Sequence, residues 1–191
     1  MAFDIQFESP ALTNSLKEIV RRYINEFRQR EGRELEFFAR LKDNPARAIE
    51  HACLALLPSG KRFSHQRRIP RIVLEEAHRR IASQNLKGCV SFHDLFLLVY
   101  CCTKDIKGYG ELCVYDTSLR LGAFLNLEPE YIYLHAGTRR GAKALGINPK
   151  EVYVTKEELP KPFRSLKPRE IEDCLCIYED ELYEISRGEA I

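Results

Sequence analysis

Residues 91–125 read SFHDLFLLVYCCTKDIKGYGELCVYDTSLRLGAFL, and this stretch decides the fold. Apolar side chains occupy nearly every position of residues 92–104, which predicts a helix that lies in the middle of its domain. The turn Ile106-Lys107-Gly108-Tyr109-Gly110 follows, and residues 111–125 return to apolar residues at helical spacing. Two helices joined by a short glycine turn predict a mainly α-helical fold.

The two glycines of this turn also suggest a binding function. Gly108 and Gly110 tolerate backbone angles that residues with a Cβ atom resist, and they leave the first amides of the second helix uncovered. Such amides and the helix dipole attract an anion. We therefore predict that Lys107, Gly108, Tyr109 and Gly110 contact nucleic-acid phosphates, although the carboxylate of Glu111 would repel a phosphate there.

Two other segments have the composition of phosphate-binding turns. The loop KRFSHQRRIPR at residues 61–71 is strongly basic and runs into a predicted helix at 70–83. The turn at residues 137–143 begins a short predicted helix at 139–145, which Thr138 is expected to cap. The residues that we expect to contact nucleic acid here are Arg67, Arg68, Thr138, Arg139, Arg140 and Lys143. The alternative for both segments is an ordinary cap or loop with solvated arginines.

The rest of the sequence predicts further helices and one β-ribbon within a single helical domain over residues 1–191. Asn44-Pro45 and the Ser91/Asp94 pair are helix-start signals, the second of them a capping box. The additional predicted helices span residues 13–30, with an apolar continuation to 42 beyond Gly32, then 45–57 and an acidic C-terminal helix at 168–185. Residues 131–134 and 151–154 are expected to pair as a two-stranded β-ribbon.

Composition narrows the class of protein. The 191 residues carry a net charge of +2 and are 45% apolar, which is enough for a core but gives no global basic field. Seven cysteines are present without a CxxC pair, so we expect free thiols, no metal and no cofactor. We read no signal peptide and no apolar run of about 18 residues, and therefore expect a cytoplasmic protein with no membrane contact. A protein partner remains open.

Residues 92–125 resemble the helix-hairpin-helix element of the DNA glycosylase superfamily. The turn at 106–110 matches that family's hydrophobic-Pro-Gly-hydrophobic-Gly pattern, with Lys107 in place of proline. Asp116-Thr117 with Arg120 is similar to the family's Val-Asp-Thr-x-x-x-Arg stretch, whose aspartate is catalytic. The resemblance implies DNA binding and a catalytic role for Asp116. However, Leu112 stands where the family's lyase enzymes have lysine, so no Schiff-base nucleophile is present there.

Three functions are compatible with these patterns. The first is a protein that binds the nucleic-acid backbone, with DNA favoured. The second is a glycosylase-like enzyme that would use Asp116 together with His135, the one acid/base couple that we can propose. In a structural interpretation, Asp116 instead pairs with Arg120 four residues later. The third is a structural or partner-binding helical protein that retains the glycine turn for packing alone.

Overall fold

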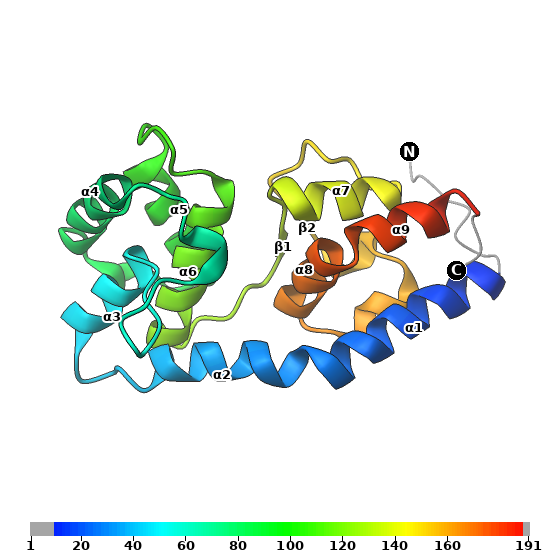
Figure 1. Ribbon diagram of the computed structural model, residues 1–191, viewed down its shortest axis with the longest axis horizontal. Helices are drawn as coiled ribbons and strands as arrows, with labels where there is room; N and C mark the ends of the chain where they lie inside the picture. Colours follow the sequence, from blue (N-terminus) through cyan, green and yellow to red (C-terminus); the bar gives the residue numbers. More distant parts are fainter. Residues whose placement is uncertain (1–9, 189–191) are drawn as a thin grey trace. The chain divides into compact units, whose positions relative to one another are not determined.

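The computed structural model describes residues 10–188 (Figure 1). They are mainly α-helical with one small two-stranded antiparallel sheet, which confirms the predicted fold class. Contacts between residues divide the chain into two compact units, where we expected one domain. Unit 1 combines the described residues up to Glu31 with those from Glu130 onward, and unit 2 is Gly32–Pro129. Unit 1 is therefore made of two separate segments of the chain, and unit 2 is the continuous segment between them.

Unit 2 is a helical bundle built around the predicted helix pair (Figure 1, cyan to green). In it α5 packs against α6 and α4, and α3 packs against α4 and α6. Its helices are the second part of α2 (Arg28–Ala39), α3 (Pro45–Cys53), α4 (Arg71–Ala82), α5 (Phe92–Thr103) and α6 (Glu111–Leu125). Two short 3-10 turns, Ser64–Gln66 and Leu86–Gly88, connect them.

Local signals in the sequence explain several helix ends in unit 2. The Asn44 side chain accepts a hydrogen bond from the Arg47 amide at 3.1 Å, and Ser91 with Asp94 forms the predicted capping box. Asn126 ends α6 in the left-handed conformation, with φ of 62°. The first helical segment differs from the prediction, because it breaks at Phe27 and continues through Gly32.

The α5–α6 pair is closely packed on one side and open on the other. A Cβ atom on Gly122 would lie 3.0 Å from the Phe92 ring, so the absence of a side chain there permits the close approach of α5 and α6. On the outer face of α5, Leu97 and Tyr100 are 44% and 46% exposed. The helix that we expected to be covered on nearly every side therefore presents an apolar face to solvent.

Unit 1 surrounds the small sheet with helices (Figure 1). Strand β1 (Ile132–Tyr133) pairs antiparallel with β2 (Tyr153–Val154), which confirms the predicted ribbon. The helices are α1 (Pro10–Glu26), α7 (Ala136–Ala144), α8 (Pro168–Ile177) and α9 (Glu179–Ser186), with 3-10 turns at Lys156–Glu158 and Lys161–Ser165. The single helix predicted at 168–185 is thus two helices, divided at Tyr178.

Candidate nucleic-acid interface

The glycine bend, residues 106–110, leads directly into the N-terminus of α6. Gly108 has φ of +94°, a conformation that favours glycine. Gly110 is the N-cap residue of α6, with φ of −82° and ψ of 177°, and it has no side chain to cap the helix. A Cβ atom at Gly110 would have nothing within 4 Å. The start of α6 is therefore open in the way that an anion-binding helix end requires.

Three contacts fix the glycine bend from within unit 2. The Tyr109 hydroxyl is hydrogen-bonded to Thr117 Oγ1 at 2.6 Å, and both side chains are buried. Val73 of α4 lies 3.6 Å from the position that a Cβ atom on Gly108 would occupy. Arg80 of α4 binds Asp105, the residue immediately before the bend, at 2.6 Å. The bend is thus held by α4 and α6 and does not hang free.

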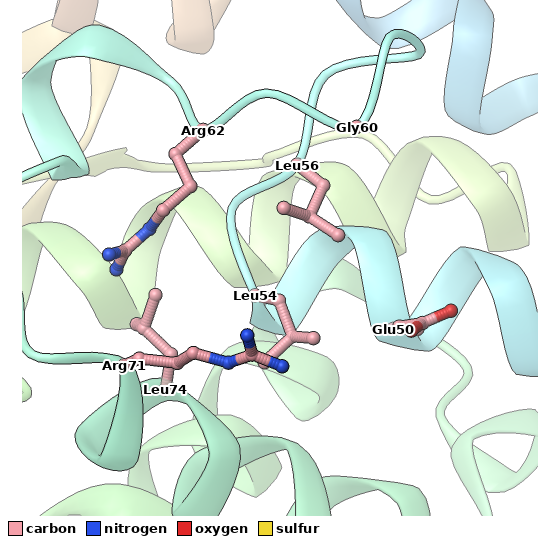
Figure 2. A pocket seen from close by; sticks show the side chains of 7 residues that line it. All are labelled: Glu50, Leu54, Leu56, Gly60, Arg62, Arg71 and Leu74. Atoms are coloured by element: carbon pink, nitrogen blue, oxygen red, sulfur yellow. The ribbon is translucent and has the colours of Figure 1, made fainter.

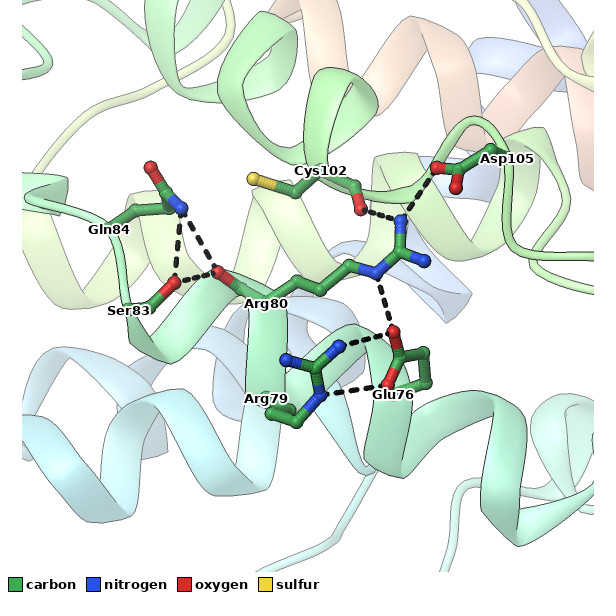
Figure 3. A network of polar contacts seen from close by, with 7 residues as sticks. All are labelled: Glu76, Arg79, Arg80, Ser83, Gln84, Cys102 and Asp105. Atoms are coloured by element: carbon green, nitrogen blue, oxygen red, sulfur yellow. Dashed lines mark hydrogen bonds and ion pairs between the residues drawn. The ribbon is translucent and has the colours of Figure 1, made fainter.

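The Arg80 contact belongs to a charged network on α4 (Figure 3). Arg80 Nη1 donates to the Cys102 carbonyl near the end of α5 as well as to Asp105. Glu76 accepts hydrogen bonds from both Arg79 and Arg80, which together lower its pKa to about 2. Glu76 is therefore ionised throughout the physiological range and keeps the Arg80 side chain in position for its contacts with α5.

The basic loop lies against the first two turns of α6. His65 Nε2 is 2.8 Å from Asp116 Oδ2, and Gln66 Oε1 accepts a hydrogen bond from Arg120 at 2.9 Å. The Gln66 side chain also contacts the thiol of Cys113, whose pKa is raised by burial. These contacts place residue 66 beside α6, and the contact of Val73 with Gly108 places the start of α4 beside the bend. The segment from residue 66 to residue 73 therefore has one end at α6 and the other at the glycine bend.

Arg67 and Arg68 belong to the segment between these two contacts, and Lys107 belongs to the bend that Val73 touches. All three are exposed, and within residues 10–188 none of their side chains has a hydrogen-bond or ion-pair partner. We call these three cations and the α6 end of the glycine bend the basic face. The sequence predicted each of these segments separately; in the structure the helix that follows the basic loop touches the glycine bend through Val73 and Gly108.

Arg120 is the buried centre of the polar cluster beneath the basic face. Its side chain is 2% exposed, and its guanidinium lies 4.1 Å from the centroid of the Phe63 ring. Two carboxylates balance the charge: Asp116 at 3.6 Å and Glu34 at 3.4 Å. Because a buried charge is tolerated only when it is paired, these contacts explain why the arginine can lie in the interior. The Asp-Thr-x-x-Arg stretch thus fastens the basic loop and the bend to α6.

Asp116 and His135, which we predicted as an acid/base couple, each have other partners in the structure. Asp116 is paired with His65 and Arg120 in unit 2. His135 is buried in unit 1, where its Nε2 lies 2.5 Å from Glu172 Oε1. Nothing in the local sequence points to His65, because it lies 51 positions from Asp116 in the chain.

Thr138 has a different role from the predicted one. The N-cap residue of α7 is His135, and Thr138 is the third residue of the helix. Its buried hydroxyl accepts a hydrogen bond from the His135 amide at 2.6 Å and donates one to the His135 carbonyl at 3.0 Å. The hydroxyl is therefore fully engaged within α7, and a phosphate could not use it.

The arginines of the 137–143 turn are also occupied. Arg140 pairs with Glu179 at 2.6 Å and with Asp180 at 2.8 Å, while Arg139 donates to the Glu151 carbonyl at 2.7 Å. The Glu179 carboxylate further lies 3.7 Å from the position of a Cβ atom on Gly137, where it would repel an anion. Of the residues predicted to contact phosphate at this turn, only Lys143 is exposed without such a pair among the described residues. We therefore leave this turn out of the candidate interface.

No family model, curated protein or solved structure matches this chain. The functional argument accordingly rests on the geometry of the basic face. Among residues 10–188, no helix has the length and apolar character needed to cross a membrane, and no three metal-ligating side chains form a cluster.

Unit 1 has its own buried polar cluster, between α1 and α8. The Tyr23 hydroxyl donates to Asp173 Oδ2 at 2.5 Å, and Arg28 forms an ion pair with Glu170 at 2.7 Å. Burial, reinforced by the neighbouring charge of Glu172, raises the pKa of Asp173 to about 8. We interpret this cluster as a packing contact that α1 and the first residue of α2 make with α8.

Proposed function

We propose that this protein binds the phosphate backbone of nucleic acid, in the first instance DNA, through the basic face of unit 2. One observation carries the proposal: Lys107 lies in a bend that leads into a helix N-terminus without a side-chain cap, Arg67 and Arg68 lie in the loop that runs from its contact with α6 to the helix touching this bend, and no acidic side chain of the described residues pairs with the three cations. Cations and helix-end amides that converge on one surface attract phosphate oxygens.

In this proposal the glycine bend receives one phosphate and the two arginines contact its neighbours on the strand. Phosphate contacts of this kind fix orientation but carry no base sequence information, so binding should show little sequence preference. The exposed Glu111 carboxylate lowers the positive electrostatic potential at the start of α6, so we expect moderate affinity for nucleic acid. Because the attraction is electrostatic, the affinity should fall strongly as salt is added. Asp116, Thr117 and Arg120 act indirectly, because they hold the loop and the bend in place.

The decisive experiment compares two triple variants that remove the same charge. Arg67→Gln/Arg68→Gln/Lys107→Gln removes the basic face. Arg21→Gln/Arg40→Gln/Arg79→Gln removes three exposed arginines that each pair with a glutamate three or four residues earlier in the chain. Binding to labelled duplex DNA, single-stranded DNA and RNA is measured by fluorescence anisotropy at several salt concentrations.

The first variant should lose most of its affinity, and its logarithmic salt slope should fall by about 2 to 3 because each phosphate contact contributes about 0.9. The control variant should retain the slope. Equal losses in the two variants would mean that binding follows net charge alone, and the proposed interface would be wrong. If the wild-type chain binds none of these nucleic acids at low salt, the function itself is refuted.

A role in binding a protein partner is the second candidate, and the outer face of α5 favours it. Leu97 and Tyr100 are half exposed there, and Val90, just before the helix, is 86% exposed. Sedimentation of the wild type and of a Leu97→Lys variant tests self-association through this face. The glycosylase-like alternative has lost support, because Asp116 is held by His65 and Arg120.

A further inference from the structure

A pocket of about 330 Å³ lies between the end of α3 and the start of α4 in unit 2 (Figure 2). Its lining combines three leucines with two arginines and one glutamate: Leu54, Leu56, Leu74, Arg62, Arg71 and Glu50. Arg62 and Arg71 lie at the two ends of the basic loop that also carries Arg67 and Arg68. The pocket thus borders the segment that forms the basic face.

The backbone after α3 is shaped to present Arg62 to this pocket. Ala55 has a positive φ of 55° and reverses the chain as α3 ends. Leu56 then pairs with Arg62 in an isolated antiparallel bridge, and Gly60, with φ of +79°, makes the turn between them. Arg62 Nη2 donates to the Ile69 carbonyl at 2.8 Å, which closes the basic loop. The wall of the pocket is therefore defined by backbone geometry and a side-chain hydrogen bond.

The two arginines retain hydrogen-bonding capacity. Arg62 Nε is buried and has no acceptor among the described residues, an unusual condition for a buried polar atom. Arg71 uses its Nε for Glu75 at 2.7 Å, and its side chain is 82% exposed, so its terminal nitrogens are free to turn inward. Guanidinium groups bind phosphate and carboxylate in a planar, bidentate manner. The arginines therefore suit one small oxyanion.

The remaining lining suits a flat apolar group with an N–H donor. Figure 2 shows Arg62 at one end of the pocket and Glu50 at the other, with Leu54, Leu56 and the Arg71 guanidinium between them and Leu74 below Arg62. The leucines offer apolar contact, and a carboxylate accepts hydrogen bonds from an exocyclic amino group such as that of cytosine. The volume is at the lower end of the range for ligand pockets, about 300 to 1,000 Å³, which limits the occupant to a single small molecule.

We propose that this pocket binds one nucleoside monophosphate unit, with the phosphate on Arg62 and Arg71, the base against Leu54 and Leu74, and an amino group on Glu50. The unit has two possible sources: a free nucleotide, or the unpaired end of a strand on the basic face. The second source rests on the proposed nucleic-acid binding, whereas the first does not.

The test uses the full chain with isotope-labelled methyl groups. Cytidine 5′-monophosphate should shift the methyl signals of Leu54, Leu56 and Leu74, whereas inorganic phosphate or cytidine alone should bind more weakly. Arg71→Gln should weaken binding about tenfold, the value of one charge-assisted hydrogen bond. Arg79→Gln is the matched control, because Arg79 is an equally exposed arginine of α4 with a glutamate partner and lies outside the pocket. Glu50→Gln should reduce the preference for the cytidine nucleotide over its uridine counterpart.

Equal effects of Arg71→Gln and Arg79→Gln, or nucleotide shifts that avoid the three leucines, would overturn the pocket assignment. The triple variant that lacks the basic face separates the two proposals. If it still binds the free nucleotide in the pocket, the pocket site stands even where DNA binding fails. If the wild type binds DNA but neither a free nucleotide nor a single-stranded overhang shifts the leucine methyls, the pocket proposal alone is refuted.

Discussion

Replacing Gly110 tests the glycine bend most directly, since this position admits side chains without disturbing the fold. Its φ and ψ are those of an N-cap residue, and a Cβ atom would meet nothing within 4 Å. Gly110→Asn and Gly110→Asp should therefore both cap α6 and stabilise the protein by a few tenths of a kcal/mol. The aspartate should add about 0.3 to 1 kcal/mol through the helix dipole. Both variants should melt at or above the wild-type temperature.

Binding should separate the two variants, because only the aspartate carries a charge. A carboxylate about 5 Å from a bound phosphate costs about 1 to 3 kcal/mol at effective dielectric constants between those of water and a protein surface. The Gly110→Asp variant should therefore bind DNA about fivefold to 150-fold more weakly than Gly110→Asn. The difference should shrink as salt is added.

Fluorescence anisotropy at low salt measures the two affinities, and circular dichroism provides the melting temperatures. Because both side chains cap the same amides and have nearly the same size, the comparison isolates the charge. If the two variants bind DNA equally well while both are folded, no phosphate lies at the start of α6, and the reasoning about the glycine bend is wrong.

Three further predictions concern stability. Tyr109→Phe and Thr117→Val should each lower the free energy of unfolding by about 1 to 3 kcal/mol, because each leaves the other buried hydroxyl without its hydrogen-bond partner. The double variant should lose less than the sum of the two single losses. Additive losses would contradict this coupling. Because burial raises the pKa of Asp173 on folding, the folded protein keeps this proton at pH values where the unfolded chain has released it; the free energy of unfolding should therefore fall as the pH rises above the ordinary carboxyl pKa, and Asp173→Asn should flatten this profile in thermal denaturation. Gly141→Ala would place a Cβ atom 2.2 Å from the Leu175 carbonyl oxygen and should lower the free energy of unfolding by more than about 2 kcal/mol. Gly32→Ala adds a Cβ atom in open space on α2 and should raise the free energy of unfolding by up to about 1 kcal/mol. Calorimetry of the two variants measures both changes.

The parts of this structure that the sequence predicted well depend on neighbouring residues. The bounds of α6 follow from Gly110 before it and Asn126 after it, and the start of α5 follows from the capping box. Thr138 was assigned to the wrong position because a threonine near a helix start is compatible with either the cap or the third residue. In the structure His135 is the N-cap residue, which places Thr138 third in the helix.

The features that escaped prediction depend on distant residues. No periodicity indicates that Arg120 would be buried against Phe63, or that His65 would be the partner of Asp116. The pocket is equally invisible in the sequence, because its lining comes from two helices and the loop between them. The sequence identified the charged segments, and contacts with distant residues pair Arg139 and Arg140 of the unit 1 segment, whereas the side chains of Arg67, Arg68 and Lys107 have no hydrogen-bond or ion-pair partner among the described residues.

The burial of Arg120 links ligand binding to the unfolding of unit 2. Asp116 pairs with this interior charge and also binds His65 of the basic loop, and Gln66 of the same loop accepts a hydrogen bond from Arg120, so loss of the buried cluster should release the loop. A ligand that binds only the folded form of unit 2 must then raise its free energy of unfolding, by about 2.7 kcal/mol at a free ligand concentration of about 100 times Kd. Slower amide hydrogen exchange along α6 would reveal such a ligand even before its chemical identity is known.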